Sequence, residues 1–145
     1  MTPTPHVFFR ARSPRDEEFD DPPGAVIARM LDKKLEEEGI THEPFDNWRD
    51  CGWWIICTIN GKQVQIYFAS WPQTAEDGWL LAIAPLREVG FFGRIFGKKP
   101  IDYSSEINQL SQLVDRFLNE NEMFSNIRWC LNGVPNELGV TGLPC

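Results

Sequence analysis

The sequence predicts an α+β protein built as a two-layer sandwich, in which an antiparallel sheet of three to five strands packs two helices on one face. Three observations predict this class: a hairpin pattern with one apolar face in residues 52–71, and two segments, 22–39 and 104–119, with apolar residues at helical spacing. Sheets and helices that are apolar on one side bury those sides against each other. The expected order of elements is α-β-β-β-α-β.

Residues 1–21 are expected to form an N-terminal arm, and residues 22–145 a single globular domain. The arm is rich in proline and charge and ends in the acidic run DEEFDD. Within it, residues 6–10 (HVFFR) fit either an edge strand of the sheet or a mobile arm, and the sequence leaves both open. A chain of 145 residues has the length of one ordinary domain.

The first helix is predicted between Pro22-Pro23 and Gly39. Proline suits the first turn of a helix, and glycine is common just after the last turn. Charged residues lie mainly on one side of this helix, and residues 41–51 follow it as a loop that contains Pro44. The apolar stripe consists of Val26, Ile27, Met30, Leu31 and Leu35.

The hairpin is predicted to turn at Asn60-Gly61, because both residues tolerate the positive φ of a two-residue type I′ turn. This turn fixes the register and sorts the side chains onto two faces. The inner face, which is almost wholly apolar, pairs Cys57 with Val64, Ile55 with Ile66 and Trp53 with Phe68. The outer face, which is polar and aromatic, pairs Thr58 with Gln63, Ile56 with Gln65 and Trp54 with Tyr67.

A third strand at residues 79–84 completes an antiparallel meander, and residues 85–103 form a long loop. The second helix, at residues 104–119, has Ser104 as its expected N-cap. Residues 126–131 (NIRWCL) form a short strand before an Asn-Gly turn and an irregular tail. The apolar stripe of the second helix consists of Ile107, Leu110, Val114, Phe117 and Leu118.

Charge and hydropathy exclude several classes of function. The net charge of -7 and the pI near 4.8 disfavour binding to nucleic acid or to an anionic membrane, because polyanion binding depends on basic residues. No apolar run approaches the roughly 20 residues that span a bilayer, and no secretory signal is evident, so a cytoplasmic protein is expected. The four cysteines form no recognisable framework, and reduced thiols are expected.

No pattern indicates an enzyme, a metal site or a cofactor. The sequence contains no P-loop, G-x-G-x-x-G, G-x-S-x-G or H-E-x-x-H motif, and its two histidines, His6 and His42, are far apart. His42 has Glu43 and Asp46 nearby as candidate acids, but a solvated loop histidine is the more ordinary interpretation. We therefore expect no catalytic residue, no metal ligand and no bound cofactor.

The candidate partner-binding residues are Trp54, Tyr67, Trp71, Phe92, Arg94 and Phe96. The first three lie on or beside the outer face of the hairpin, and large aromatic side chains anchor protein interfaces. The last three belong to the basic and aromatic loop at residues 90–100 (GFFGRIFGKKP), on an otherwise acidic chain. Two alternatives stay open: the termini cover the outer face, or the loop phenylalanines fold back onto the core.

In size, charge and expected architecture, the chain resembles the small acidic α+β immunity and inhibitor proteins that bacteria use against their own toxins. The resemblance implies a non-enzymatic protein-binding module that acts on a basic partner. One alternative is a structural protein that forms a homodimer through the outer face or through the strand at residues 126–131. Another is a small-molecule binder with a pocket where His42 or a cysteine meets a carboxylate.

Overall fold

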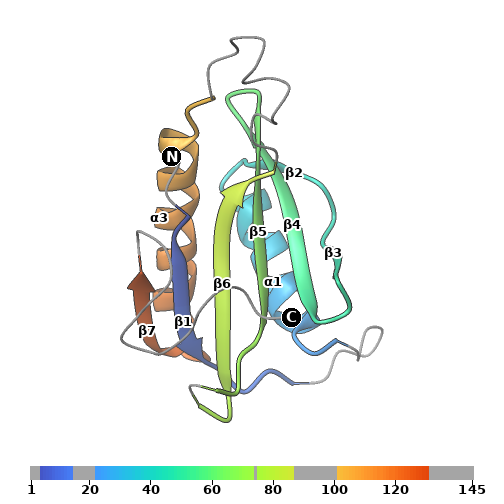
Figure 1. The fold of residues 1–145 in the computed structure, drawn as a ribbon, viewed down its shortest axis with the longest axis vertical. Coiled ribbons are helices and arrows are strands. Elements are labelled where there is room, and N and C mark those ends of the chain that lie inside the picture. The colour runs from blue at the N-terminus through green and yellow to red at the C-terminus, as the bar shows by residue number, and fades with distance from the viewer. Residues whose placement is uncertain (1–3, 15–21, 74, 87–100, 131–145) are drawn as a thin grey trace, which may run out of the picture.

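The computed structural model describes residues 4–14, 22–73, 75–86 and 101–130, and Figure 1 shows how their elements are arranged. In these ranges, neither helix combines the length and the apolar character needed to cross a membrane. The elements are β1 (His6–Arg10), α1 (Ala25–Glu37), β2 (Thr41–His42), β3 (Asp46–Trp48), β4 (Gly52–Ile59), β5 (Lys62–Ser70), β6 (Gly78–Pro85), α3 (Ser104–Glu120) and β7 (Ser125–Cys130).

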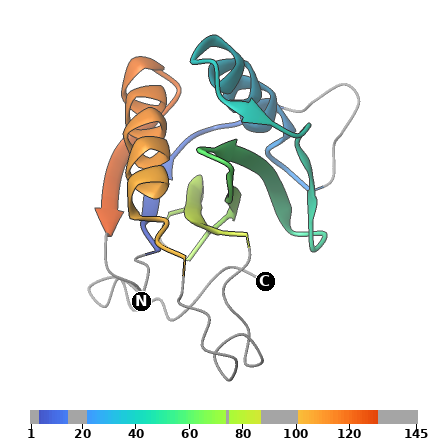
Figure 2. The same cartoon turned by 90° about the horizontal axis from the view of Figure 1, so that it is seen from above.

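The described strands form one seven-stranded antiparallel sheet with the order β2-β4-β5-β6-β1-β7, in which β3 also pairs with β4. Helices α1 and α3 lie side by side on the same face of this sheet (Figure 2). The predicted α+β class, the antiparallel sheet and the two helices are confirmed. The sheet is larger than the three to five strands expected, and the order of elements differs from the prediction.

The additional strands come from two places where local sequence signals are weak. Residues 6–10 form β1, which pairs with both β6 and β7 and therefore lies inside the sheet instead of at its edge. Its consecutive buried residues, Val7, Phe8 and Phe9, suit a strand that is covered on both faces. The predicted loop at residues 41–51 contains β2 and β3, which are too short to show any periodicity.

The central hairpin forms as predicted. Asn60 and Gly61 have φ angles of 53° and 74°, the positive values that a type I′ turn requires at both central residues. All six predicted cross-strand pairs between β4 and β5 are present, from Thr58 opposite Gln63 to Trp53 opposite Phe68. The turn therefore sets which side chains of the hairpin face the helices and which face away.

The main core fills the space between the sheet and the two helices. Both predicted helical stripes face it, except that Val26 and Met30 are only partly buried. At one end Phe124 packs edge-on against Phe9 of β1, with ring centroids 5.4 Å apart, and against Phe117 of α3 at 5.2 Å. Burial of one such side chain contributes about 1.5–3 kcal/mol, so this cluster ties α3 to the sheet.

The two helices begin differently from the sequence prediction. Helix α1 follows Gly24, whose φ of 107° and close approach to Trp79 leave no room for a side chain. Helix α3 includes Ser104 as its first residue, and the Ser104 backbone N–H donates to the Asp102 carboxylate at 2.9 Å. The predicted Ser104 cap is therefore wrong: Asp102 provides the acceptor at this helix end.

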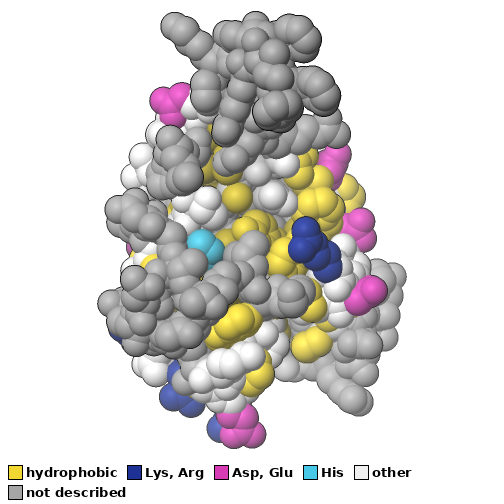
Figure 3. All heavy atoms as spheres, in the orientation of Figure 1, with side chains coloured by type: hydrophobic (Ala, Val, Ile, Leu, Met, Phe, Trp, Pro, Cys, Tyr) yellow, Lys and Arg dark blue, Asp and Glu magenta, His cyan; other side chains and the backbone are white. Residues whose placement is uncertain are grey.

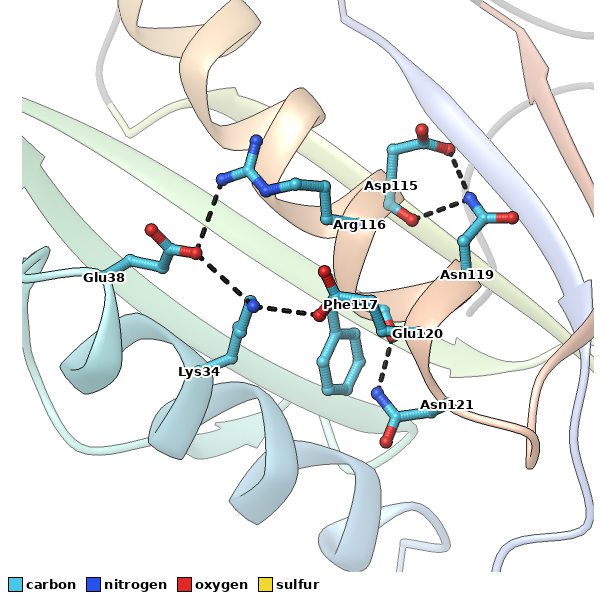
Figure 4. A network of polar contacts seen from close by, with 8 residues as sticks. All are labelled: Lys34, Glu38, Asp115, Arg116, Phe117, Asn119, Glu120 and Asn121. Atoms are coloured by element: carbon cyan, nitrogen blue, oxygen red, sulfur yellow. Dashed lines mark hydrogen bonds and ion pairs between the residues drawn. The ribbon is translucent and has the colours of Figure 1, made fainter.

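Polar contacts join α1 to α3 at the surface (Figure 4). The Lys34 ammonium lies 3.4 Å from Glu38 and 3.1 Å from Glu120, and Arg116 lies 3.5 Å from the same Glu38 carboxylate. The hydrogen bond to Glu120 is the main cause of the raised pKa of Lys34. Because the partners of Lys34 are partly or largely exposed, each of these ion pairs is expected to contribute little to stability.

The cysteines do not all follow the expectation of reduced thiols. Cys57 and Cys130 are reduced, but Cys51 is disulfide-bonded. The expectation is therefore wrong for Cys51, and no spacing pattern in the sequence indicates its bond.

Candidate functional site

The candidate site lies on the outer face of the sheet, which we define as the face opposite α1 and α3. Figure 3 views this face, where hydrophobic side chains gather near its middle with basic and acidic side chains beside them. Strand pairing places one row of neighbouring residues across it, from the β3 edge to the β7 edge. The row consists of Asp46, Trp54, Tyr67, Ala82, His6 and Cys130.

The two ends of this row are more exposed than its middle: Asp46 is exposed, and Cys130 is half-buried. Trp54 is half-buried, whereas Tyr67 and Ala82 have exposed fractions of only 5% and 1%. Tyr67 is buried because the ring of Trp48, from β3, packs on it at a centroid distance of 4.7 Å. This burial raises the pKa of Tyr67. Of the two predicted neighbours, Trp54 is therefore the one that presents surface to a partner.

Among the described residues, the predicted Trp71 does not share a cluster with Trp54. Trp71 is half-buried and packs with Phe8 and Leu80 in a cluster separate from the Trp48 and Tyr67 cluster. Phe92, Arg94 and Phe96 lie outside the described residues, as does the whole loop at residues 90–100.

Trp54 stands between two open grooves. The first, which we call the acidic groove, has a volume of about 440 Å³ and carries two carboxylates. The second, which we call the Arg49 groove, has a volume of about 420 Å³ and one guanidinium. The acidic groove is lined by Glu43, Pro44, Phe45, Asp46, Trp54 and Ile56. The Arg49 groove is lined by Asn47, Trp48, Arg49, Trp54, Gln65, Tyr67 and Leu86.

The turn between β3 and β4 shapes the Arg49 groove. Arg49 and Asp50 both have positive φ, at 52° and 58°, a conformation that is costly for residues other than glycine. The Asp50 N–H donates to the Asn47 side chain at 2.7 Å, which helps to hold this turn. The turn places the Arg49 guanidinium over the Trp48 ring, 5.6 Å from its centroid.

Gly52 allows the sheet to continue directly beside this turn. A Cβ atom at Gly52 would lie 2.0 Å from the Phe68 carbonyl oxygen, so no other residue fits without movement of the backbone. Gly52 opposes both Trp48 on β3 and Ala69 on β5.

His42 does meet a carboxylate, although not one of the two candidates near it in sequence. Its Nε2 lies 2.7 Å from Asp32 Oδ1 on α1, and its Nδ1 lies 2.8 Å from the Ile40 carbonyl oxygen. Its side chain is only 8% exposed, so the interpretation as a solvated loop histidine is wrong. Cys57 opposes His42 across β2 and β4.

This arrangement does not suit nucleophilic catalysis. Cys57 is completely buried, and burial raises the pKa of its thiol to about 12, so the thiolate needed for attack is scarce at neutral pH. Both ring nitrogens of His42 already face other acceptors, which leaves neither available to deprotonate Cys57. Among the described residues, no group of three His, Cys, Asp or Glu side chains is placed to hold a metal ion.

Comparisons with known protein families, with characterised proteins and with solved structures find no match for this chain.

Proposed function

We propose that the chain is a non-enzymatic protein-binding module that docks a basic partner protein against the outer face around Trp54. An immunity-like or inhibitor-like role fits this activity. One observation carries the proposal: a half-buried tryptophan lies between two open grooves, beside the short edge strand β3.

The shape of the site favours a protein over a small molecule. Both grooves are open to solvent, whereas small-molecule sites enclose most of the ligand surface. A tryptophan that keeps part of its ring exposed offers a large and stiff contact area with one hydrogen-bond donor. Such residues are over-represented among those that contribute most to protein–protein affinity.

The charge of the chain favours a basic partner. The net charge of -7 produces a negative field that accelerates the encounter with a cationic protein and weakens with added salt. Exposed carboxylates of Glu43 and Asp46 lie beside Trp54 in the acidic groove. The local charge of this groove is therefore negative, like the net charge of the chain, and both favour a positively charged partner.

The test is affinity purification from the native host with the wild type and two matched variants. Trp54→Ala removes the proposed anchor, and Trp129→Ala removes another half-buried indole from β7, at the far edge of the described sheet. With the purified partner, we expect Trp54→Ala to weaken binding at least ~30-fold, as for an interface residue worth about 2 kcal/mol or more, and Trp129→Ala to change it little. Equal affinities for the wild type and Trp54→Ala would contradict the proposal.

Self-association is a second candidate, because the outer face carries opposite charges on the two sides of Trp54. Arg49 lies in one groove and Glu43 and Asp46 line the other, an arrangement that two-fold symmetry can match with itself. Strand β7 also forms an edge of the described sheet, with only β1 as its neighbour there. Light scattering across a wide concentration range measures the molar mass in solution and so tests this candidate. A mass that rises to that of a dimer with concentration supports self-association, and a mass that stays at that of the monomer contradicts it.

A further inference from the structure

We infer that the acidic groove is the binding site for an arginine side chain supplied by the partner protein. The inference rests on the proposed function and specifies its chemistry, since it names the group that the groove recognises. The reasons are the apolar floor of the groove, its two carboxylates, and the distribution of arginine–aromatic contacts in the chain.

The floor of the acidic groove suits the aliphatic part of a long basic side chain. Trp54 and Ile56 are alternate residues of β4, so both project onto the outer face, and both are half-buried. Arginine buries its methylene stem on apolar surface while its charged head stays near water. A groove with an apolar floor and an acidic wall provides for both parts.

The wall of the groove supplies the countercharge. Glu43 and Asp46 are both exposed, and among the ion pairs of the described residues none involves either carboxylate. One oxygen of Asp46 accepts the Asn47 N–H at 2.7 Å, which fixes the orientation of this carboxylate. A guanidinium has five donors in a planar fork and is matched to carboxylate acceptors better than an ammonium group.

The chain already places its own arginines on one aromatic ring that lines each groove. Arg49 lies over Trp48 at 5.6 Å, and Arg29 lies over Phe45 at 5.4 Å. In the described parts of the chain, no such cation lies over Trp54, which lines the groove together with the two carboxylates. A guanidinium from another protein could therefore stack on Trp54 and add a cation–π contact, which is strongest with tryptophan.

The test uses the purified protein and capped tripeptides of the form Gly-X-Gly, observed by NMR of the Trp54 indole and of the backbone amides of Glu43, Phe45 and Asp46. In X we place arginine, lysine, and citrulline, which keeps the shape of arginine but has no charge. We expect shifts confined to this groove, with arginine binding more tightly than lysine and citrulline not binding. Added salt should weaken the arginine peptide.

Three variants and a matched control locate the interaction. Glu43→Gln and Asp46→Asn should each weaken the arginine peptide roughly two- to fivefold, the usual range for an exposed ion pair. Glu37→Gln, which neutralises an exposed carboxylate on α1 in the groove between the helices, should leave binding unchanged. Trp54→Leu should also weaken it roughly two- to fivefold, because it keeps an apolar floor but removes the aromatic face.

Several results would overturn the inference. Equal binding of the citrulline and arginine peptides, preference for lysine, or indifference to Glu43→Gln and Asp46→Asn would each do so. A dimer in which Arg49→Gln alters the shifts of the acidic groove would assign the groove to a second copy of this chain instead. If the partner complex is weakened by Trp54→Ala but not by the two carboxylate variants, the proposed function stands, and the inference that the acidic groove binds arginine is rejected.

Discussion

His42 joins α1 to β2 through a contact that depends on its protonation. Both groups that face its ring nitrogens, the Asp32 carboxylate and the Ile40 carbonyl, are acceptors. Each ring nitrogen therefore has to carry a hydrogen and donate a hydrogen bond. The geometry is therefore that of an imidazolium ion. Burial alone would lower the pKa of His42. The hydrogen bond to the Ile40 carbonyl and the carboxylates of Asp32 and Glu36 have a larger combined effect and raise the pKa above 6.5.

We predict that His42→Gln lowers the free energy of unfolding by about 1.5 kcal/mol at pH values below 6.5. A hydrogen bond to a charged group contributes about 1.5–3 kcal/mol, and the lower end applies because the Asp32 side chain is 25% exposed and partly screened. Because the pKa is raised in the folded state, this contribution is complete below the unfolded value of 6.5. It is lost as the pH rises through the folded-state pKa.

The assay is urea unfolding, followed by tryptophan fluorescence, of the wild type and His42→Gln from about pH 5.5 to about pH 9. The difference between the two proteins is the informative quantity, because His6 acts in the opposite direction. Burial lowers the pKa of His6, so its contribution is present above 6.5 and is lost as the pH falls. A difference that stays constant with pH, or an NMR titration of His42 at or below 6.5, would refute the reasoning.

Three further predictions concern the sheet and its attachment to α3. Glu106 is 2% exposed and accepts from the Lys62 ammonium at 2.9 Å, so Glu106→Gln should lower the free energy of unfolding by about 2 kcal/mol in urea titrations at neutral pH. That loss should shrink in acid, because Lys62 lowers the pKa of Glu106. Gly52→Ala should lower the free energy of unfolding by about 3 kcal/mol, because the added Cβ would meet the Phe68 carbonyl oxygen. Thermal unfolding measures this loss, and an unchanged melting temperature would contradict the close approach of β4 to β5 at this residue. Cys57 should resist alkylation at about pH 8 in the folded protein and react in urea, with mass spectrometry locating the label.

The parts of the fold that could be predicted are those fixed by local chemistry. The Asn60-Gly61 turn sets the hairpin register pair by pair, and the stripes of the two helices extend over several turns. Strands β2 and β3 could not be predicted, because two or three residues show no period and acquire their structure from pairing with β4. The position of β1 depends on pairing with segments far along the chain, which no local signal indicates.

The candidate site was predictable only in part, for the same reason. Trp54 was found because the hairpin register assigns it to the outer face. The grooves beside it, and the cover that Trp48 places over Tyr67, depend on β3 and on its strained turn at Arg49 and Asp50. A non-glycine turn with positive φ leaves no recognisable dipeptide, in contrast to Asn-Gly.

The interior position of β1 has a consequence for how the protein is made. Val7 lies opposite Leu81 on one side and Trp129 on the other, so β1 leaves the ribosome long before either neighbour exists. At about 5–20 residues per second, translation takes roughly 6 to 24 seconds to bring Trp129 after Val7. Until Leu81 of β6 is made, roughly 4 to 15 seconds after Val7 at this rate, the nascent chain displays Val7, Phe8 and Phe9 with no strand to pair with, an opportunity for chaperones and a hazard for misassembly.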